Sequence, residues 1–448
     1  MSGSPSAPAV GPATDEAGYP SPFVAWTMVA VLFLAYILSF IDRMIIGLLV
    51  EPLKADLDLT DTQVSLLQGF AFAIFYTVMG LPLGRLIDRS ARLPIVAAGV
   101  GLWSLMTAAC GLAGQYWQLF VARMGVGVGE ATLSPAAYSI ISDTFPQKRL
   151  GLAMGVYGLG SAVGAGLAFL IGAFIIELVA STGSVVLPMV GEVRAWQATF
   201  LIVGLPGLLV AGLFLLLPEP MRQGAAGQPA DQVQVPISSV LDFARRRAGA
   251  VMGLCFAVAM VNFAVFAAVS WFPVFLIRVH GFTLTQAGHL AGAALIVGGL
   301  IGLVGGGWVT DRFGGGTPAG RLAFCGYAGM VGTVFAVIFP LVGNPLVAAA
   351  AFVVFFASAA VPIGAAASAL QQLTPNRMRA TFSAIYLFIV NLIGLGAGPT
   401  ATALVGDTFF PFDTGIRYAI TVVSPISFAV AAGLFLMSAA YARRPMAV

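Results

Sequence analysis

Long uninterrupted runs of apolar residues constrain this chain more than any other feature of its sequence. A helix needs about 20 residues to cross the roughly 30 Å hydrocarbon layer of a membrane, and each run reaches or exceeds that length. Only 9% of the residues are charged, against about a quarter in an average soluble domain, which excludes an ordinary water-soluble enzyme. A membrane β-barrel is excluded too, because its strands alternate over about 10 residues. The sequence predicts a polytopic α-helical membrane protein with twelve spans, at about 24–49, 64–86, 93–113, 117–142, 150–179, 195–217, 249–278, 286–310, 321–342, 345–370, 380–405 and 417–441.

The residues outside and within these runs predict short tails and no metal or redox chemistry. The first 23 residues hold two acids but no Lys or Arg, so they lack the basic start of a secretory signal. We expect 1–23 to be a disordered cytoplasmic tail and 443–448 to be a second cytoplasmic tail. The three cysteines lie within apolar runs and have no metal-binding or disulfide spacing: Cys110, Cys255 and Cys325. We therefore expect no metal and no cofactor.

The basic residues are distributed unevenly between the two sides of the predicted spans. The side that carries both termini has 15 of the 21 Lys and Arg residues, and the opposite side has four. Because cytoplasmic loops are enriched in these residues, we expect both termini in the cytoplasm. The net charge of +3 reflects this topology and indicates no nucleic-acid partner. The four on the opposite side are Lys54, Arg194, Arg278 and Arg417, and two more lie inside spans, Arg43 and Arg123.

A long polar interruption divides the spans into six and six. Its Pro, Gly and Gln content is typical of a flexible linker, and the run ISSVLDFARRR that follows predicts a short basic helix on the inner membrane surface. GRLIDR after the second span recurs as GWVTDR after the eighth, and FPQKR after the fourth corresponds to TPNRMR after the tenth. This tandem repeat predicts two six-helix bundles, 24–217 and 249–442, joined by a cytoplasmic linker, 218–248. Secondary transporters are built in this way, with the substrate site between the halves.

The repeated loop resembles the signature of the major facilitator superfamily, and the resemblance covers essentially the whole chain. The loop signature appears as Gly84, Asp88, Arg89 and Arg92, and less completely as Gly307, Asp311 and Arg312. A second signature, an Arg followed by spaced glycines, appears in the fourth span as Arg123, Gly127 and Gly129. The resemblance implies an all-α membrane protein with the major facilitator fold and rocker-switch alternating access. It also implies a conformational gate that joins the cytoplasmic ends of spans 2 and 11 in the outward-open state, made by Gly84, Asp88, Arg89, Arg92, Asp311 and Arg312.

Within that superfamily the chain resembles the Spinster family of lysolipid and sphingosine-1-phosphate transporters. The motifs that carry this resemblance are SFIDR (39–43), LLQ (66–68), RLIDR (85–89), RMGVGVGEAT (123–132), TPNRMRA (374–380) and GLGAGP (394–399). The sequence departs from the family pattern at Leu86, Ile87 and the Ser90–Ala91 pair before Arg92. The resemblance implies a bacterial-type member in the inner (plasma) membrane.

Two acids and two bases lie deep within spans 1 and 4: Asp42, Arg43, Arg123 and Glu130. A charge at the bilayer centre costs about 2.5–3.5 kcal/mol, so such residues face a cavity or a partner. Arg123 and Glu130 share one helix face, whereas Asp42 and Arg43 point about 100° apart, and we expect one or two ion pairs between the spans. The functional interpretation is proton coupling, in which Asp42 or Glu130 releases a proton as an arginine approaches it. The alternative is a static pair that only fixes helix packing.

The second half offers polar side chains but no comparable charge. Asn262, Tyr386 and Asn391 stand out among apolar residues in its spans. A cavity between the halves with one charged and one apolar wall suits an amphipathic substrate, whose head would lie near Arg123. A small solute fits the residues equally well, and the Spinster resemblance favours a lysophospholipid or a phosphorylated sphingoid base. The predicted substrate-binding residues are Arg123, Glu130, Asp42, Asn262, Tyr386 and Asn391.

Other classes of protein lack their characteristic motifs in this sequence. It contains no G-x-x-x-x-G-K-[ST] for ATP and no G-x-S-x-G nucleophile, and His280 and His289 do not form a metal site. We therefore predict a proton-coupled secondary transporter, not an enzyme, that works as a monomer on a lipid-like substrate in the bilayer. The alternatives are a proton-linked carrier of a small organic solute or drug and a membrane receptor that does not transport.

Overall fold

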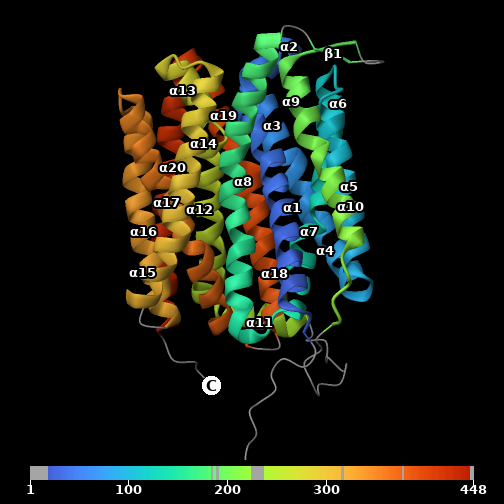
Figure 1. Ribbon diagram of the computed structural model, residues 1–448. Coiled ribbons are helices and arrows are strands. Elements are labelled where there is room, and N and C mark those ends of the chain that lie inside the picture. The colour runs from blue at the N-terminus through green and yellow to red at the C-terminus, as the bar shows by residue number, and fades with distance from the viewer. Residues whose placement is uncertain are drawn as a thin grey trace, which may run out of the picture.

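The computed structural model is a bundle of long helices that run along one common axis (Figure 1). It describes residues 19–182, 185–187, 191–222, 237–313, 317–375 and 378–443. Within this described part, eleven helical segments are long and apolar enough to cross a membrane. The remaining predicted span, 117–142, is present as two shorter helices, α6 (Tyr116–Glu130) and α7 (Leu133–Thr144). The predicted fold class, an all-α membrane protein with twelve spans in two six-helix bundles, is confirmed.

The chain order of the elements follows the predicted repeat. The other elements of the N-terminal half are α1 (Pro22–Leu48), α2 (Val50–Leu57), α3 (Asp61–Gln68), α4 (Phe70–Arg89), α5 (Arg92–Cys110), α8 (Gln147–Thr182), the antiparallel strands β1 (Val185–Leu187) and β2 (Gly191–Val193), α9 (Ala195–Gly204) and α10 (Pro206–Leu216). Those of the C-terminal half are α11 (Ile237–Arg246), η1 (Ala248–Met252), α12 (Gly253–Val269), α13 (Phe272–His280), α14 (Leu284–Leu300), η2 (Ile301–Gly305), α15 (Gly306–Phe313), α16 (Pro318–Leu341), α17 (Pro345–Leu373), α18 (Arg379–Val390), η4 (Asn391–Ala397), α19 (Gly398–Phe409), η5 (Asp413–Gly415) and α20 (Ile416–Ala442).

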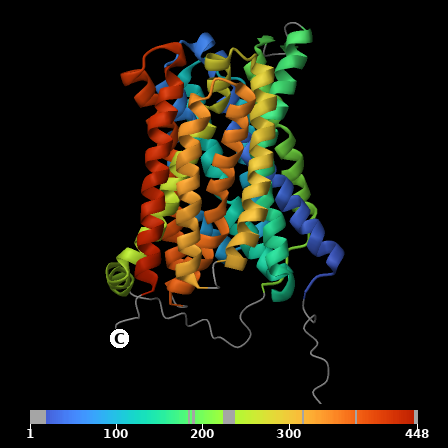
Figure 2. The same cartoon turned by 90° about the vertical axis from the view of Figure 1, so that its left-hand side faces the viewer.

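The two ends of the bundle differ in what they carry. Helix α1 begins and α20 ends at the end where α11 lies, which we call the terminal face (Figures 1 and 2). The opposite end carries the β1–β2 pair, and we call it the hairpin face. The predicted tails, 1–23 and 443–448, fall largely outside the described residues, and so does the middle of the predicted linker, 218–248, so their limits stay predictions.

Short polar residues start several helices because a side-chain oxygen replaces a missing backbone acceptor. Thr60 accepts from the backbone amide of Gln63 at the start of α3, and Thr283 does the same for Gln286 at the start of α14. Each glutamine in turn accepts from the backbone amide of its threonine, which completes a capping box. Both caps lie at the hairpin face, so these threonine and glutamine residues set the positions at which the chain turns back into the bundle.

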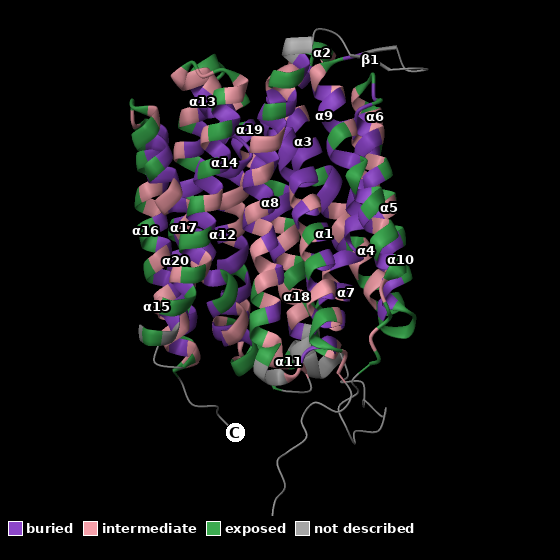
Figure 3. Cartoon of the chain, in the orientation of Figure 1, coloured by how far each residue is buried: buried purple, intermediate pink, exposed green. Residues whose placement is uncertain are grey.

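Helix α8 packs closely against both halves because glycine lets backbones approach. A Cβ atom on Gly164 would lie 2.6 Å from the carbonyl oxygen of Ile37 on α1. A Cβ atom on Gly166 would lie 2.7 Å from the carbonyl oxygen of Gly292 on α14, in the other half. These small residues hold the two halves in contact along α8. Figure 3 colours each residue of the bundle by how far it is buried.

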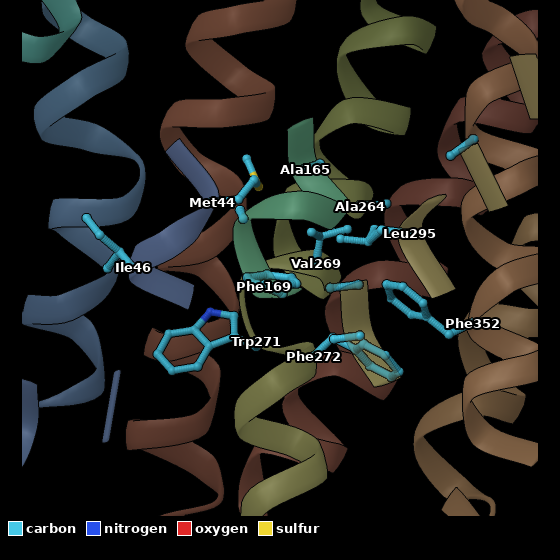
Figure 4. Close-up of a cluster of buried hydrophobic side chains, with 14 of the residues drawn as sticks. Met44, Ile46, Ala165, Phe169, Ala264, Val269, Trp271, Phe272, Leu295 and Phe352 are labelled. Carbon is cyan, nitrogen blue, oxygen red and sulfur yellow. The ribbon is translucent and has the colours of Figure 1, made fainter. Parts of the chain in front are cut away.

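An apolar cluster fills the space between the halves toward the hairpin face (Figure 4). The Phe272 and Phe352 rings stack with their centroids 3.8 Å apart. The indole of Trp271 donates to the carbonyl oxygen of Pro399, at 3.0 Å. Met44 and Phe169 bring α1 and α8 of the N-terminal half into the same cluster. This cluster packs apolar side chains of both halves together between the middle of the bundle and the hairpin face.

Candidate functional site

A cavity of about 600 Å³ lies between the two halves, a volume within the usual range for ligand-binding pockets. Met44 and Val269 line its deep end, at the edge of the apolar cluster. Its other end is lined by Arg85 and Asp88, which are exposed near the end of α4 on the terminal face. The cavity therefore opens toward the terminal face and ends inside the bundle.

The wall formed by the N-terminal half is cationic and aromatic. Arg43 lines the cavity together with Tyr36 and Phe40 of α1, Tyr76 of α4 and Tyr138 of α7. The guanidinium carbon of Arg43 lies 5.0 Å from the centre of the Phe40 ring and 4.8 Å from that of Tyr76. Rings at this distance stabilise a cation where water is scarce. The wall therefore presents the positive charge of Arg43 with the phenol hydroxyls of tyrosines beside it.

A buried carboxylate holds that arginine from behind the wall. The Nε atom of Arg43 lies 2.6 Å from Oε2 of Glu130, and the Ser39 hydroxyl donates to the same oxygen at 2.7 Å. Glu130 is only 1% exposed and does not line the cavity. The second oxygen of this carboxylate has no partner among the described residues. The sequence predicted one or two ion pairs between spans 1 and 4, and this contact is such a pair.

Arg123, near which the sequence predicts the head of a substrate, is fully buried behind the cavity wall and does not line the cavity, so this role stays a prediction. Its guanidinium donates to two backbone carbonyl oxygens, those of Asp42 at 3.1 Å and Leu67 at 3.3 Å. The Asp42 carboxylate instead accepts from the Thr107 hydroxyl at 3.1 Å. Like Glu130, Asp42 lies behind the wall, so three of the predicted substrate-binding residues form a buried layer: Arg123, Glu130 and Asp42.

The wall formed by the C-terminal half is mostly apolar and carries the polar side chains singled out in the sequence. Asn262, Tyr386 and Asn391 all line the cavity. The amide of Asn262 donates to the carbonyl oxygen of Val258, one helical turn earlier, at 3.0 Å. The rest of this wall is apolar, with Val261, Val265, Phe266, Phe356, Leu387 and Phe388 among its side chains. The two walls together suit a molecule with a charged end and an apolar end.

The predicted gate residues fall into two groups. Gly84 and Asp88 line the mouth of the cavity, and Arg89 and Arg312 are exposed on the terminal face. The side chain of Asp311 lies outside the described residues. No described residue forms an ion pair with Asp88 in this arrangement, so the closing contact implied by the resemblance stays a prediction.

Arg92 departs from the predicted gate because its side chain is fully buried. It pairs with Asp143 near the end of α7 and with Glu219 after α10, whose Oε1 lies 2.8 Å from Nε of Arg92. All of these residues belong to the N-terminal half, so Arg92 ties one bundle together and does not reach the other. Partial burial alone would raise the pKa of the Glu219 carboxyl, but bonds from the side chain and backbone of Arg92 and from the Leu93 amide lower it below 4.5.

A cluster of charges that the sequence patterns do not predict closes the hairpin face. Arg278 on α13 makes two bonds to the Asp61 carboxylate of α3, at 2.6 and 2.9 Å, and one to Glu51 of α2, at 2.7 Å. Lys54 lies 2.5 Å from the same Asp61. Arg278 is far in sequence from the other three residues, and the sequence indicated only that Lys54 and Arg278 lie on the same side of the membrane. One signal was available, since Lys54 and Arg278 are two of only four basic residues on that side.

A second contact across the halves lies beside this cluster. The hydroxyl and the backbone amide of Thr62 donate to the Asp407 carboxylate, at 2.6 and 3.1 Å. Asp407 belongs to α19 in the C-terminal half and Thr62 to α3 in the N-terminal half. The hairpin face is thus closed by polar bonds above the apolar cluster, while the terminal face is open. Among the described residues no group of His, Cys, Asp and Glu is arranged to hold a metal ion.

A twelve-span bundle made of two repeated halves, with a cavity between them that opens to one face only, is the architecture of a secondary transporter. The chain belongs to the Major Facilitator Superfamily, whose profile matches residues 32–399. It is similar to a protein described as an MFS-type efflux pump from Mycolicibacterium smegmatis, with 29% identity over 90% of this chain and 89% of that protein. It also resembles a probable L-galactonate transporter from Escherichia coli, with 24% identity over 86% of this chain and 84% of the relative.

Two further comparisons concern the Spinster proteins. The chain is similar to the mouse sphingosine-1-phosphate transporter SPNS2, with 28% identity over 56% of this chain and 43% of that protein. It resembles the crystal structure of a bacterial homologue of the human lysosomal transporter Spinster in an inward-facing, unoccupied conformation. That likeness has a TM-score of 0.74 and 27% identity, and covers 94% of this chain and 97% of the other. The resemblance to the Spinster family predicted from the sequence is confirmed, and this chain is a transporter and not an enzyme.

Proposed function

We propose that this protein is a proton-coupled carrier of an anionic amphipath with one acyl or alkyl chain, such as a lysophospholipid or a phosphorylated sphingoid base. The observation that carries the proposal is the position of Arg43. It lines the cavity on one side and is bonded to the buried Glu130 on the other. The mostly apolar wall opposite would cover the chain of the substrate, with Asn262, Tyr386 and Asn391 beside it. The relative named as a sphingosine-1-phosphate transporter agrees with this substrate class.

The coupling follows from competition for a single cation. With Glu130 ionised, its carboxylate occupies the Nε side of Arg43 and offsets the charge of the guanidinium. An anionic head entering the cavity competes with Glu130 for that charge. Protonation of Glu130 removes the competitor, so a proton and an anionic substrate favour each other's binding. Ser39, which donates to the same carboxylate, can then stay bonded to the neutral acid by turning its hydroxyl.

Asp42 and Arg123 have a different proposed role in the same layer. Arg123 joins the backbones of α1 and α3 through the carbonyl oxygens of Asp42 and Leu67. One oxygen of Asp42 and one nitrogen of Arg123 have no partner among the described residues. A small rearrangement of α1 can bring these two groups into an ion pair. Asp42 would then be a second protonation site, beside Glu130, whose proton affinity depends on the position of the helices. We therefore keep all four residues, Asp42, Arg43, Arg123 and Glu130, in the proposed coupling layer.

The proposed orientation places the terminal face, with α11 and both chain ends, in the cytoplasm. Its support is the excess of basic residues in the loops on that side. The cavity would then be open to the cytoplasm, and the bonds of Arg278 and Thr62 would close the outer side. Alternating access requires these outer bonds to break as a contact across the terminal face forms.

Transport of a fluorescent lysophosphatidic acid by purified protein in liposomes, with and without a pH gradient, tests the proposal. We expect a gradient to accelerate flux by the natural protein. Glu130→Gln should carry the lipid at a rate that no longer depends on the gradient, and Arg43→Gln should lose affinity for the anionic head. Arg417→Gln is a matched control, because this arginine bonds only to backbone carbonyl oxygens within the C-terminal half among the described residues. Gradient-driven flux that survives Glu130→Gln would contradict coupling through Glu130.

A second substrate class has specific support and enters the same experiment. Asn262 and Asn391 could bond the hydroxyl groups of a small sugar acid whose carboxylate binds Arg43, and one relative is named a probable L-galactonate transporter. Competition separates the two classes. Excess galactonate should leave lipid flux unchanged if the substrate is an amphipath, and galactonate uptake without lipid flux would replace our proposal by a sugar-acid carrier.

A further inference from the structure

A second hollow lies on the outside of the bundle, between η1–α12 and α20. It has a volume of about 500 Å³ and shares no lining residue with the cavity between the halves. Its lining residues recur every three or four positions, so each set forms one stripe along its helix. Phe256, Val430 and Met437 are about two-fifths exposed or more, which places this hollow on the outer surface. We call it the α12–α20 groove, lined by Ala248, Gly249, Met252, Gly253, Phe256, Met260, Val430, Leu434 and Met437.

The floor of this groove is shaped by glycine. A Cβ atom on Gly249 would lie 2.5 Å from the ring of Tyr441, and one on Gly253 would lie 2.5 Å from the hydroxyl oxygen of Ser438. The two helices therefore approach closely behind the groove, and methionine and phenylalanine side chains form its sides. Methionine adapts its shape readily to flexible apolar ligands. The groove is thus lined by apolar side chains.

Basic residues cluster at the end of the groove on the terminal face. Arg245, Arg246 and Arg247 directly precede Ala248, and Arg443 follows Met437 by about 9 Å along α20. Helix α11 lies across the end of the bundle beside the foot of α20 (Figure 2). Among the described residues, none of these four arginines forms an ion pair with a carboxylate.

The position of this basic cluster is fixed by packing. The ring of Phe243 on α11 meets that of Phe382 on α18 edge to face, with centroids 5.2 Å apart. Because Phe382 is fully buried, the contact anchors α11 against the C-terminal half. Asp242 is the one acid within α11. The cluster therefore keeps a net positive charge at the end of the groove on the terminal face.

The length of the groove matches one leaflet of a membrane. Ala248 to Met260 corresponds to about 18 Å along a helix axis, and half of the hydrocarbon layer is about 15 Å thick. An acyl chain lying in the groove would therefore reach from the headgroup level to the middle of the bilayer. Positive charge at one end and an apolar channel below it complement a lipid with an anionic headgroup.

We propose that the α12–α20 groove binds a diacyl anionic phospholipid from the leaflet on the terminal face. One acyl chain lies along the groove, and the phosphate group lies at the basic end of the groove, which carries Arg245, Arg246, Arg247 and Arg443. This site is separate from the transport cavity, and the lipid in it is bound and not carried. Because α11 contacts α18, the lipid also holds the basic helix against a span that lines the cavity.

Native mass spectrometry of the full-length protein in detergent tests the site. The probes are dioleoylphosphatidylglycerol, dioleoylphosphatidylcholine at the same concentration, and inorganic phosphate. We expect one phosphatidylglycerol to be retained more than tenfold more tightly than phosphatidylcholine, a difference of about 1.4 kcal/mol. Inorganic phosphate, which cannot use the apolar groove, should not displace it. Displacement by phosphate would assign the basic cluster to a free anion and overturn the lipid site.

Three variants separate the two parts of the site. R245Q/R246Q/R247Q should abolish the preference for phosphatidylglycerol, and A248F should lower the retention of both lipids by filling the groove. R149Q removes an exposed arginine from the start of α8 and should leave retention unchanged. If the triple variant does not fold, the lipid retention of A248F alone tests the proposal. Retention that is unaffected by A248F, or a loss that R149Q reproduces, would overturn the proposal.

Discussion

Removing Arg278 should open the hairpin face. Its guanidinium makes three bonds across the halves, to Asp61 and Glu51, and its side chain is only 13% exposed. Losing one partner of such a buried charge pair costs about 2–5 kcal/mol. We take about 2–3 kcal/mol for Arg278→Gln, because Lys54 still pairs with Asp61 and the Glu51 side chain is 34% exposed. The closed hairpin face should therefore lose about 30- to 150-fold in population relative to the open one.

Double electron–electron resonance measures this shift directly. Spin labels at Trp117→Cys and Leu346→Cys would report the separation of the halves, since both positions are exposed and start helices at the hairpin face. The native cysteines are buried and should not compete for the label: Cys110, Cys255 and Cys325. We expect a new, longer distance to appear in Arg278→Gln at neutral pH.

Two control variants test whether the Arg278 cluster closes the hairpin face. Arg417→Gln removes an arginine from the same face that bonds to Pro340 and Leu341 within the C-terminal half, so it should leave the distances unchanged. Asp61→Asn should resemble Arg278→Gln, and the double variant should add little to either. A distance distribution in Arg278→Gln that matches the natural protein would refute the assignment of this cluster as the outer closure.

Three further outcomes follow from packing and charge. Glu219→Gln should lower the free energy of unfolding by about 1–2 kcal/mol at pH 7. Because the folded-state pKa is lowered below 4.5, this contribution is present above that value and is lost as the pH falls through the folded-state pKa. The thermal midpoints of variant and natural protein should therefore converge as the solution is acidified. Gly166→Leu should lower the thermal midpoint, because its side chain meets the Gly292 carbonyl, whereas Gly155→Leu, in open space on the same helix, should not. The three buried cysteines should react with a fluorescent maleimide only on heating, and rapid labelling of the folded protein would contradict their burial.

The sequence predicts the fold well because span length and loop charge are local properties. The length of each apolar run can be read directly from the sequence. The repeated GRLIDR and GWVTDR loops show where the second half begins without any knowledge of packing. The fourth span is the partial exception. It divides at Ala131 and Thr132 into α6 and α7, which hydropathy does not reveal.

The candidate site was only partly predictable, because its geometry depends on how helices are rotated about their axes. Asp42 and Arg43 are adjacent, and nothing in the sequence says which of them faces the cavity. The structure places Arg43 on the wall and Asp42 behind it. The bonds of Arg278 could not be found from sequence patterns, since its partners Glu51 and Asp61 lie in the other half of the chain.

The four buried charges of spans 1 and 4 have a consequence for how a membrane voltage acts on the protein. With both acids ionised, Asp42, Arg43, Arg123 and Glu130 sum to zero, so the voltage does little work when the empty carrier reorients. A proton bound alone would give this layer one positive charge, worth about 2.3 kcal/mol per 100 mV if carried across the whole membrane. One proton bound together with a monoanionic head restores neutrality. Current recorded from the working carrier would therefore report whether protons and substrate cross in equal numbers.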